Sequence, residues 1–418
     1  MTARFSTPED VNLWDLEMFR EGRAHEAFDF LREHAPVHYH DRDGATPFWA
    51  ITRYDDVKAV LRDPMTFSSA KGMALQPAVE PDDPMAGFDI GEIAGGQMLI
   101  MTDPPRHRGH RKVLVDRFTP LAIRALEPRV REITNKCLDE AAEAGEVDFV
   151  NDIAHRVPSS VTFDIMGVPE EDWARLAELE HQLITPDDAD TPDGLSPVAA
   201  ALGAQAEILA YFGPFAMERR ANPGDDIISA LTLGTVEGAP LSDMEVVLDA
   251  LLFIAGGLDT TRASASSGGL LGLLDNPDQE AALRKDPTMI NTAVEEFVRW
   301  ASPIVHVMRT ATCDTEVRGQ TIKEGDTLGL WLASANRDSA VFDNPYTFDI
   351  ARQKNEHVSF SYGEHFCLGA HLARLVLRVE FEEMLARFTK IELIDEPQRV
   401  KSNFVGGLKH AKVRLTNK

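Results

Sequence analysis

The segment FSYGEHFCLG, residues 360–369, sets a single cysteine, Cys367, between two glycines and directly before an amphipathic run. A thiolate at the N-terminal end of a helix is stabilised by the helix dipole and by unpaired backbone N–H groups, so we expect a lowered thiol pKa and a charged, metal-ligating sulfur. Gly363 and Gly369 allow the backbone to approach a large flat cofactor closely. A single thiolate that leaves the opposite face of an iron open is a known arrangement of haem, whereas a structural zinc site needs more ligands.

The chain is strongly acidic. Its 418 residues contain 42 Lys and Arg against 68 Asp and Glu, a formal net charge of −26. Such a charge disfavours a broad electrostatic footprint on nucleic acid or on an anionic membrane, so we expect neither as a partner. We find no low-complexity linker and no internal repeat that separates independent cores, and we therefore expect one domain over residues 1–418.

The cysteines favour a reducing compartment. Only Cys137, Cys313 and Cys367 occur, with no CxxC pair among them, so a disulfide framework is not expected and the cytoplasm fits best. Residues 1–21 are polar and acidic and lack an apolar stretch of signal-peptide length. Since the chain nowhere offers roughly 18 continuous apolar residues, we expect no membrane anchor.

Helix patterns dominate the chain and strand patterns occur at both ends, so the predicted fold class is mainly α with small β-sheets (α+β). Residues 37–39 and 48–52 have the pattern of short strands, and 54–61 that of a helix. A small sheet is therefore expected to begin near the N-terminus. Residues 309–332 alternate like a hairpin with a turn near Gly325.

Two segments lack regular periodicity. Residues 68–102 are rich in Gly, Pro and Met, and long irregular segments of this kind are often lids or binding loops, so we expect this one to cover a pocket. Residues 185–197 contain Pro186, Pro192 and Gly194 between two helical patterns, and we expect them to form a solvated, mobile connection.

Residues 242–275 predict one long central helix. Ser242 is a suitable N-cap with Glu245 three residues later, and Pro277 supplies a stop. The stretch 251–258 is apolar on all sides, as expected of a helix that crosses the interior of a domain.

The same helix carries an unusual group, Gly256 and Gly257 followed by Asp259, Thr260 and Thr261. Two adjacent glycines cost a helix interior roughly 1 kcal/mol each relative to alanine, and a buried unpaired carboxylate costs several kcal/mol more. Taken alone, the group fits a glycine packing contact followed by a solvent-facing aspartate. Together with the cysteine segment, it favours a functional site.

The chain resembles a soluble bacterial cytochrome P450, a haem-thiolate monooxygenase, nearly from end to end. Residues 360–369 fill every fixed position of the family pattern F-x-x-G-x-H-x-C-x-G, with Cys367 as the axial ligand of the iron. The resemblance implies the cytochrome P450 fold, with haem b (iron protoporphyrin IX) between the long central helix and the helix that follows the cysteine loop. Phe360 and Gly369 are then expected beside the cofactor.

Residues 256–261 match the family's oxygen-activation segment. In that segment an acid and an alcohol relay protons to dioxygen, which implies that Asp259 and Thr260 are catalytic.

Glu296 and Arg299 match the family's E-x-x-R pair, and Arg352 resembles the third member of that structural triad. Three residues apart, the first two share a helix face, where an exposed ion pair contributes only about 0.2–0.5 kcal/mol. In a buried network, the loss of one partner would strand a charge at a cost of roughly 3–5 kcal/mol. We therefore assign the triad to folding, where it would fix the loop before Cys367.

Residues 106–112, RHRGHRK, form a basic cluster in an acidic chain. By itself the cluster fits a solvated helix face. His107 and Arg111 match an H-x-x-x-R pair that holds the haem propionates in the family, while Arg309 and His365 resemble further propionate contacts. The remaining bases are expected to face outward and to dock an acidic [2Fe-2S] or similar ferredoxin in a salt-sensitive encounter.

The residues that should line the distal pocket, by their position in the family, are almost all apolar. They are Ile100, Leu252, Ala255, Gly256, Val305, Val307 and Val405. A pocket of this kind binds mainly through buried area, at roughly 25 cal/mol per Å², and offers few polar anchors. The resemblance therefore implies a terpenoid, a steroid or another hydrophobic small molecule as substrate.

The expected function is insertion of one oxygen atom from O2 into a C–H bond of that substrate, with electrons from NAD(P)H passed through a ferredoxin reductase and a ferredoxin. Two alternatives stay open. A haem-thiolate enzyme could use peroxide, or rearrange its substrate, without external electrons, although Asp259 and Thr260 argue against this. A non-enzymatic haem-based sensor could keep Cys367, but it would have little use for an acid and an alcohol on the central helix.

Overall fold

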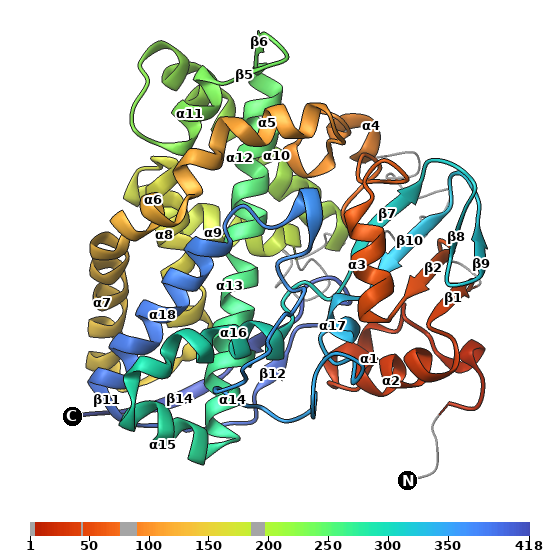
Figure 1. The fold of residues 1–418 in the computed structure, drawn as a ribbon. Coiled ribbons are helices and arrows are strands. Elements are labelled where there is room, and N and C mark those ends of the chain that lie inside the picture. Colours follow the sequence, from red (N-terminus) through yellow and green to blue (C-terminus); the bar gives the residue numbers. More distant parts are fainter. Residues whose placement is uncertain (1–4, 43–44, 76–89, 185–196) are drawn as a thin grey trace.

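The computed structural model of the protein describes residues 5–42, 45–75, 90–184 and 197–418. Helices make up most of it and fill the left and centre of Figure 1, whereas the largest sheet lies on the right, next to the N-terminal helices. The predicted class, mainly α with small β-sheets, is confirmed. None of the helices in these ranges combines the length and the apolar character that a membrane crossing requires.

Helices follow one another along most of the chain. The α-helices are α1 (Leu16–Arg20), α2 (Ala24–His34), α3 (Tyr54–Arg62), α4 (Ile90–Ala94), α5 (Arg106–Val115), α6 (Pro120–Ala125), α7 (Glu127–Ala144), α8 (Arg156–Met166), α9 (Trp173–Ile184), α10 (Pro197–Ala221), α11 (Ile227–Leu233), α12 (Asp243–Gly257), α13 (Asp259–Ala263), α14 (Leu271–Leu274), α15 (Pro277–Lys285), α16 (Ile290–Ala301), α17 (Leu332–Ala335) and α18 (Ala370–Arg387). The short 3₁₀ helices are Pro8–Asp10, Leu99–Met101, Asp116–Phe118, Glu170–Asp172, Pro287–Met289 and Gly363–His365, and the π-helical turns are Val150–Ala154 and Ser264–Leu270.

The largest sheet has five strands in the order β1-β2-β10-β7-β3. Its strands are β1 (Val37–His40), β2 (Phe48–Ile51), β3 (Phe67–Ser68), β7 (Val307–Ala311) and β10 (Thr327–Leu330). β2 and β10 run parallel and the other neighbours antiparallel, with Leu328 opposite both Trp49 and Arg309. The predicted early strands and the helix after them are confirmed. The late hairpin is confirmed as the antiparallel pair β7–β10, but Gly325 does not form the turn that joins the pair, because a second small hairpin stands between these strands.

The remaining sheets are smaller. That inserted hairpin pairs β8 (Thr315–Val317) with β9 (Gln320–Ile322), a three-stranded sheet joins β11 (Phe388–Leu393), β14 (Lys412–Asn417) and β4 (Glu146–Asp148), and two further pairs are β5 (Thr235–Val236) with β6 (Ala239–Pro240) and β12 (Gln398–Arg399) with β13 (Leu408–His410).

The central helix begins as predicted. Ser242 Oγ accepts a hydrogen bond from the Glu245 N–H (3.3 Å), and Glu245 Oε2 accepts one from the Ser242 N–H (2.7 Å). The prediction of one continuous helix over residues 242–275 is wrong. The helix breaks between α12 and α13 and again at the π-helical turn before α14. At the first break the Thr260 hydroxyl donates to the Gly256 carbonyl (2.9 Å), and a side chain that bonds into the backbone ladder in this way disturbs it.

The central helix and α18 share one hydrophobic core. Leu251, Ile254 and Leu258 are buried in the same apolar cluster as Leu375 and Val379 of α18. α18 also contacts α13 directly. The segment that carries Cys367 therefore leads into a helix packed against the centre of the fold.

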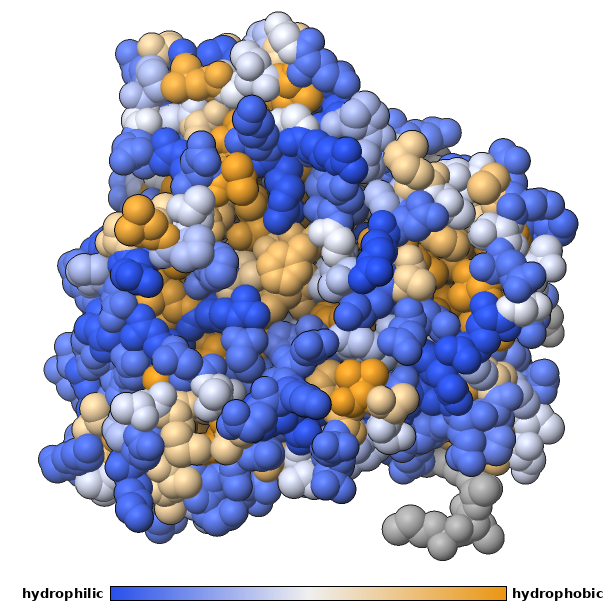
Figure 2. Space-filling model, in the orientation of Figure 1, coloured by the Kyte–Doolittle hydropathy of each residue, from blue (hydrophilic) through white to orange (hydrophobic). Residues whose placement is uncertain are grey.

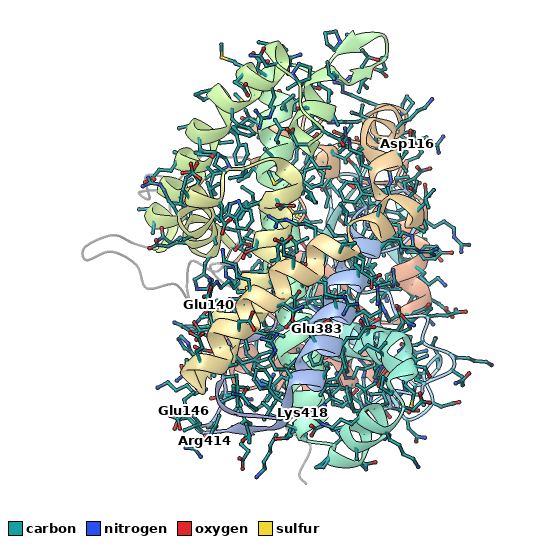
Figure 3. The ribbon with its side chains drawn as sticks, turned by 90° about the vertical axis from the view of Figure 1, so that its left-hand side faces the viewer. Asp116, Glu140, Glu146, Glu383, Arg414 and Lys418 are labelled. Atoms are coloured by element: carbon teal, nitrogen blue, oxygen red, sulfur yellow. The ribbon has the colours of Figure 1, made fainter. Side chains whose placement is uncertain are left out.

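α7 crosses α18 on the side of the molecule shown in Figure 3, where Glu383 of α18 is labelled. Arg131 of α7 binds Glu382 of α18 (2.8 Å) and Glu127 of its own helix (2.9 Å), and it also pairs with Glu383. These bonds hold α18 from the side opposite the central helix.

Parts of the two irregular segments lie outside the described residues. Of the expected lid, positions 76–89 are not described, and the remainder includes β3, α4 and the turn Leu99–Met101. Of the expected connection over 185–197, only position 197 is described, as the first residue of α10. A single domain over residues 1–418 stays a prediction.

Candidate active site

Cys367 lies in a turn just before α18. Its backbone N–H donates to the Phe360 carbonyl (2.9 Å). Gly363 has a φ of +73°, and a Cβ there would lie 2.7 Å from the Leu61 carbonyl of α3, so this position requires glycine. At Gly369 the nearest atom to an added Cβ is Cys367 Sγ, 4.0 Å away. The Gly369 side of the sulfur is thus free of crowding side chains.

The thiol of Cys367 does not have the lowered pKa that its position before a helix suggested. Burial raises its pKa, and the Gly369 backbone and the charges of Arg111 and Arg374 only reduce the rise. The expected lowering of the Cys367 pKa is therefore wrong when only the protein's own groups act on the thiol. The residue is still exposed on one side. A cation bound there would stabilise the thiolate, as metals do for the thiols that coordinate them.

A partly buried ion pair supports the cysteine turn. Arg374 of α18 binds Glu295 of α16 through two nitrogens (2.6 and 2.9 Å), and His357 lies 3.2 Å from the same carboxylate. Burial acts to raise the pKa of Glu295, but hydrogen bonds from Arg374 and His357 lower it to about 2. The Arg374 guanidinium also lies 4.4 Å from the Phe360 ring centre. Sequence reasoning missed this group because no local spacing links its members.

Four of the expected cofactor contacts lie together: His107, Arg111, Arg309 and His365. The ring centres of His107 and His365 are 4.1 Å apart. Burial, then the charges of Arg309 and other neighbours, lowers the pKa of His365 to about 2, and burial with the Arg111 charge lowers that of His107 to about 4. Both imidazoles are therefore neutral at physiological pH, and each offers one N–H as a donor.

The two arginines of this group have no direct ion-pair partner among the described residues, although Asp103 acts on Arg309 and Glu364 on Arg111 through space. Among the described residues no carboxylate pairs with Arg111 or Arg309, and the Nη1 of Arg309 donates instead to the Met308 carbonyl (2.7 Å). Burial lowers the pKa of Arg309 to about 10. The buried Nδ1 of His107 also has no hydrogen-bond partner within the described chain. Two guanidinium groups and two imidazoles of this kind suit a ligand with two carboxylates.

The other bases of residues 106–112 are largely neutralised, contrary to expectation. Arg106 pairs with Glu237 (3.2 Å) and with Glu245 of α12. Arg108 has an exposed side chain, but its Nη2 lies 2.5 Å from Glu364 Oε1. The predicted outward basic face is therefore weaker than the sequence cluster suggested, since acidic residues distant in sequence pack beside α5.

His110 is buried, so the expectation that it faces outward is wrong. Its Nε2 lies 2.6 Å from Asp249 Oδ2 of α12, and Asp249 Oδ1 accepts a hydrogen bond from the Leu99 N–H (2.8 Å). Burial raises the pKa of Asp249, while the bonds from His110 and Leu99 act to lower it. The pair ties α5 and the turn that carries Ile100 to the central helix. An acid within the apolar pattern of a buried helix was the one sequence signal for it.

The two central glycines have different surroundings. A Cβ on Gly257 would lie 2.8 Å from Thr162 Oγ1 of α8, so this glycine allows close helix packing. No described atom lies within 4 Å of a Cβ placed on Gly256, and this residue is exposed although its helix crosses the interior. Thr260, whose hydroxyl bonds to the Gly256 carbonyl, is partly exposed. The central helix thus has an open side at Gly256 and Thr260.

Asp259 faces α8 and α9. It is fully buried, with Oδ1 3.1 Å from Arg262 Nε and 3.9 Å from Nε2 of His155, which precedes α8. Glu180 of α9 belongs to the same cluster. The acid and the alcohol are adjacent in sequence but have different neighbours.

Glu296, Arg299 and Arg352 form one buried network. Arg299 binds both oxygens of Glu296 (2.7 and 2.8 Å), and Arg352 Nε lies 3.2 Å from Glu296 Oε2. Arg352 also donates to the carbonyls of Asp343 and Thr347 (2.7 Å each).

The network reaches the cysteine turn through Asn336. Arg299 donates to the Asn336 carbonyl (3.1 Å), and the Asn336 side chain accepts from the Val358 N–H (2.8 Å) and donates to Ser359 Oγ (2.7 Å). The latter two residues directly precede Phe360. This geometry supports the assignment of the triad to folding.

Comparison with known proteins decides the family. The family model for cytochrome P450 matches residues 214–413. Cytochrome P450-terp from a Pseudomonas species is 36% identical over 403 residues, which cover 93% of each chain. Linalool 8-monooxygenase from Pseudomonas putida is 33% identical over 410 residues, 98% of this chain and 100% of that protein. The chain belongs to the cytochrome P450 family.

A solved structure agrees with this family. A Mycobacterium marinum cytochrome P450 in complex with pseudoionone shares 34% identity with this chain and a TM-score of 0.88, over 98% of this chain and 99% of that one. The predicted family, fold and enzyme class are confirmed: the protein is a cytochrome P450 monooxygenase, an oxidoreductase that uses O2.

The residues of this cytochrome P450 fit the haem that its family membership implies. The uncrowded side of Cys367 Sγ at Gly369 suits a flat ring, and the buried Nδ1 of His107 has no hydrogen-bond partner among the described residues. Arg111 and Arg309 match two propionates in number and sign. When haem is bound, Cys367 would hold the iron, and these three residues with His365 would hold the propionates.

The expected substrate contacts of the cytochrome P450 fall into two groups. Partly or fully exposed positions are Ile100, Leu252, Ala255, Gly256 and Val307. Val305 and Val405 are buried, with 6% and 1% of their surface exposed, and the segment 303–306 bonds to 404–406. The first group contains the residues that a ligand would reach in this structure.

Proposed function

We propose that this cytochrome P450 inserts one oxygen atom from O2 into a C–H bond of a terpenoid or a molecule of similar size and polarity. The observation that carries the proposal is the open side of the central helix at Gly256, flanked by the partly exposed apolar side chains of Leu252 and Ala255. Such a surface binds mainly through apolar area. The sequence relatives also favour it, since two of the named proteins are called P450-terp and linalool 8-monooxygenase.

In this proposal the chain's own residues divide the work. When bound, the haem would supply the activation of O2, which a thiolate ligand favours. Cys367 is the proposed ligand, and the apolar side chains along α12 exclude water from the reacting carbon. Thr260 would position a proton-bearing water with its hydroxyl, and Asp259 would supply the protons. Glu296, Arg299 and Arg352 would hold the cysteine turn in place.

A ligand panel tests the substrate class. We expect acyclic and monocyclic terpenoid alcohols to shift the haem spectrum of the purified protein toward high spin, with little shift from polar molecules of equal volume. Leu252→Phe should weaken binding of the larger terpenoids, while Leu385→Phe, at a partly buried site on the far half of α18, should not. Shifts from steroids alone would overturn the terpenoid assignment.

We also propose that electrons come from NAD(P)H through an acidic ferredoxin in the cytoplasm. The proposed docking surface is the face in Figure 2 formed by α5, α18 and the segment before Cys367, where apolar residues gather in the centre and hydrophilic residues surround them. Phe366 is 39% exposed there. Lys112 is exposed and has no ion-pair partner among the described residues, whereas Arg108 would have to leave Glu364 to bind a partner.

Reduction kinetics test the docking surface. We expect the rate of reduction by ferredoxin to fall as salt is added and to fall further in Lys112→Glu, because the encounter is steered by charge. Lys390→Glu, on β11, is the matched control and should leave the rate unchanged. Rates that ignore both salt and the Lys112 substitution would exclude this surface.

Two other functions remain testable. Peroxide-supported turnover that equals or exceeds turnover with ferredoxin would favour a peroxide-using enzyme. Absence of oxygen consumption with the whole ligand panel and competent reductants would favour a haem-based sensor.

A further inference from the structure

A cluster of four ionisable residues, three of them buried, lies behind the open side of the central helix. Asp259 and Arg262 belong to α13, Glu180 to α9, and His155 directly precedes α8. His155 Nε2 lies 3.6 Å from Glu180 Oε2 and 3.9 Å from Asp259 Oδ1. One ligand-type atom from each of His155, Glu180 and Asp259 lies within 4.8 Å of the others.

The polar atoms of this cluster are unsatisfied. Within the described residues, both oxygens of Asp259, both oxygens of Glu180, Nε2 of His155 and two nitrogens of Arg262 are buried without a hydrogen-bond partner. Buried polar atoms normally find a partner in the protein or in an ordered water. So many unpaired atoms at one place indicate that the cluster holds water or shared protons.

The charges of the cluster leave one carboxyl group unneutralised. Arg262 Nε lies 3.1 Å from Asp259 Oδ1, so it offsets the charge of Asp259. Burial and the Asp259 charge raise the pKa of Glu180 well above its usual value, and burial lowers that of His155 to about 4. His181 also acts on His155, and its charge would lower that pKa further. Two carboxyl groups so close together hold one proton between them.

A bound divalent cation is a weaker explanation. The three ligand types would suit one, but Arg262 lies in ion-pair contact with Asp259 and would repel it. A shared proton is compatible with Arg262, since it leaves the cluster electrically balanced.

His155 connects the cluster to the outside of the molecule. It lines a cavity of about 370 Å³ between α7, α8 and α9, whose wall also includes the charged residues Glu132, Lys136 and Glu170. His155 keeps 15% of its side chain exposed. This cavity lies on the side shown in Figure 3, on which Glu140 of α7 is labelled, and Glu140 pairs with Arg156 of the cavity wall.

We infer that His155 and Glu180 are the proton inlet of Asp259: Glu180 stores a proton and passes it to Asp259, and His155 reloads Glu180 from the cavity. In each cycle the O–H bond of Glu180 breaks and one forms on Asp259; His155 then takes a proton from cavity water and releases it to the Glu180 carboxylate. Asp259 in turn adjoins Thr260 on the open side of the helix. The inference rests on the proposed role of Asp259 in proton supply.

Infrared spectroscopy of the haem-loaded protein tests the inlet without turnover. At neutral pH we expect the carbonyl band of a protonated carboxylic acid that disappears in Glu180→Gln. Glu380, a second buried glutamate whose pKa is raised to about 8 by burial, should give its own band, which Glu380→Gln removes. In ²H₂O, exchange of the Glu180 proton for deuterium should shift this band. The exchange rate should fall by roughly tenfold or more in His155→Phe, because the relay is lost. The Glu380 band is the internal control and should exchange at the same rate in both proteins.

Two results would overturn the inference. One is the absence of a Glu180-dependent acid band at neutral pH; the other is an exchange rate of that band that His155→Phe leaves unchanged. If Glu180→Gln does not fold, the Glu380→Gln protein can be labelled with [¹³C]glutamate instead. An acid band that shifts on labelling then comes from a glutamate other than Glu380. The absence of any such band shows that Glu180 is not protonated and overturns the inference. Failure of the proposed function would instead show in the ligand panel and the redox assays, with the exchange results intact.

Discussion

Asp259 Oδ1 lies 3.1 Å from Arg262 Nε, one helical turn further along α13, and both side chains are buried. With this pairing the Asp259 carboxylate faces His155 and Glu180, while Thr260 stays on the open side of the helix. Although adjacent in α13, the two residues therefore have different neighbours: the Thr260 hydroxyl bonds to the Gly256 carbonyl, and the Asp259 carboxylate lies beside His155, Glu180 and Arg262.

Thr260→Ala should uncouple electron consumption from product formation. The substitution removes the hydroxyl that bonds to the Gly256 carbonyl, so water on the open side loses its position while the thiolate site is untouched. We expect NAD(P)H use to continue, with a smaller yield of product and a larger yield of reduced oxygen species. Thr260→Ser keeps the hydroxyl and should retain most of the coupling. Equal coupling in wild type and Thr260→Ala would remove the proposed role.

Gly256→Ala should fold well but bind bulky substrates less tightly. A methyl group at Gly256 meets no described atom within 4 Å, and alanine in a helix is favoured over glycine by about 1 kcal/mol, so stability should stay equal or rise. The matched control is Gly268→Ala, where the new Cβ would lie 2.1 Å from the Phe297 carbonyl and should cost about 1–3 kcal/mol or more. Thermal unfolding and ligand titration of both variants check this. A strongly destabilised Gly256→Ala protein would contradict the open side.

Glu296→Ala should destabilise the protein by roughly 3–5 kcal/mol, because it leaves the buried Arg299 and Arg352 without their shared carboxylate. Lys390→Ala breaks the exposed pair with Glu392 and should cost at most about 1 kcal/mol. Denaturant unfolding and haem retention are the measurements. Comparable losses in the two variants would mean that the triad does not support the fold.

Glu380 should make stability depend on pH in a defined window. Its pKa is raised to about 8 by burial, so the folded protein keeps a proton that the unfolded chain loses near the ordinary value of 4.5. The contribution of this group is fully present below the unfolded pKa and is lost as pH rises toward the folded pKa of about 8. The slope from this one group is on the order of 1.4 kcal/mol per pH unit.

Glu380→Gln should remove that part of the pH dependence. We expect the variant to gain stability relative to wild type as pH rises from about 5 to about 8, measured by denaturant unfolding at several pH values. Parallel pH profiles of the two proteins would show that Glu380 is ionised, or paired, in the folded state.

The cysteine segment carried most of what sequence could predict. The family pattern around Cys367 has a strict spacing, and each fixed position answers to a local need, such as the positive φ of Gly363 and the uncrowded approach at Gly369. The capping box at Ser242 and Glu245 is equally local. Family, fold and enzyme class followed from these short-range patterns.

The orientation of the basic cluster could not be predicted in the same way. Whether Arg106, Arg108 and His110 face solvent depends on Glu237, Glu364 and Asp249, which lie more than one hundred residues away in the chain. The His155 and Glu180 neighbours of Asp259 are hidden for the same reason, since packing of α8 and α9 brings them to the central helix. Long-range pairing of charges is a property of the packed structure.

The most direct test of thiolate-haem ligation is the carbon monoxide difference spectrum of the reduced protein, recorded for wild type and Cys367→Ser. A thiolate ligand would donate charge to the iron and would move the Soret band of the carbon monoxide complex strongly to the red. We expect that band in wild type and its loss in the variant. Folded, haem-loaded wild type without the red-shifted band would contradict ligation by Cys367, and with it the monooxygenase mechanism built on this site.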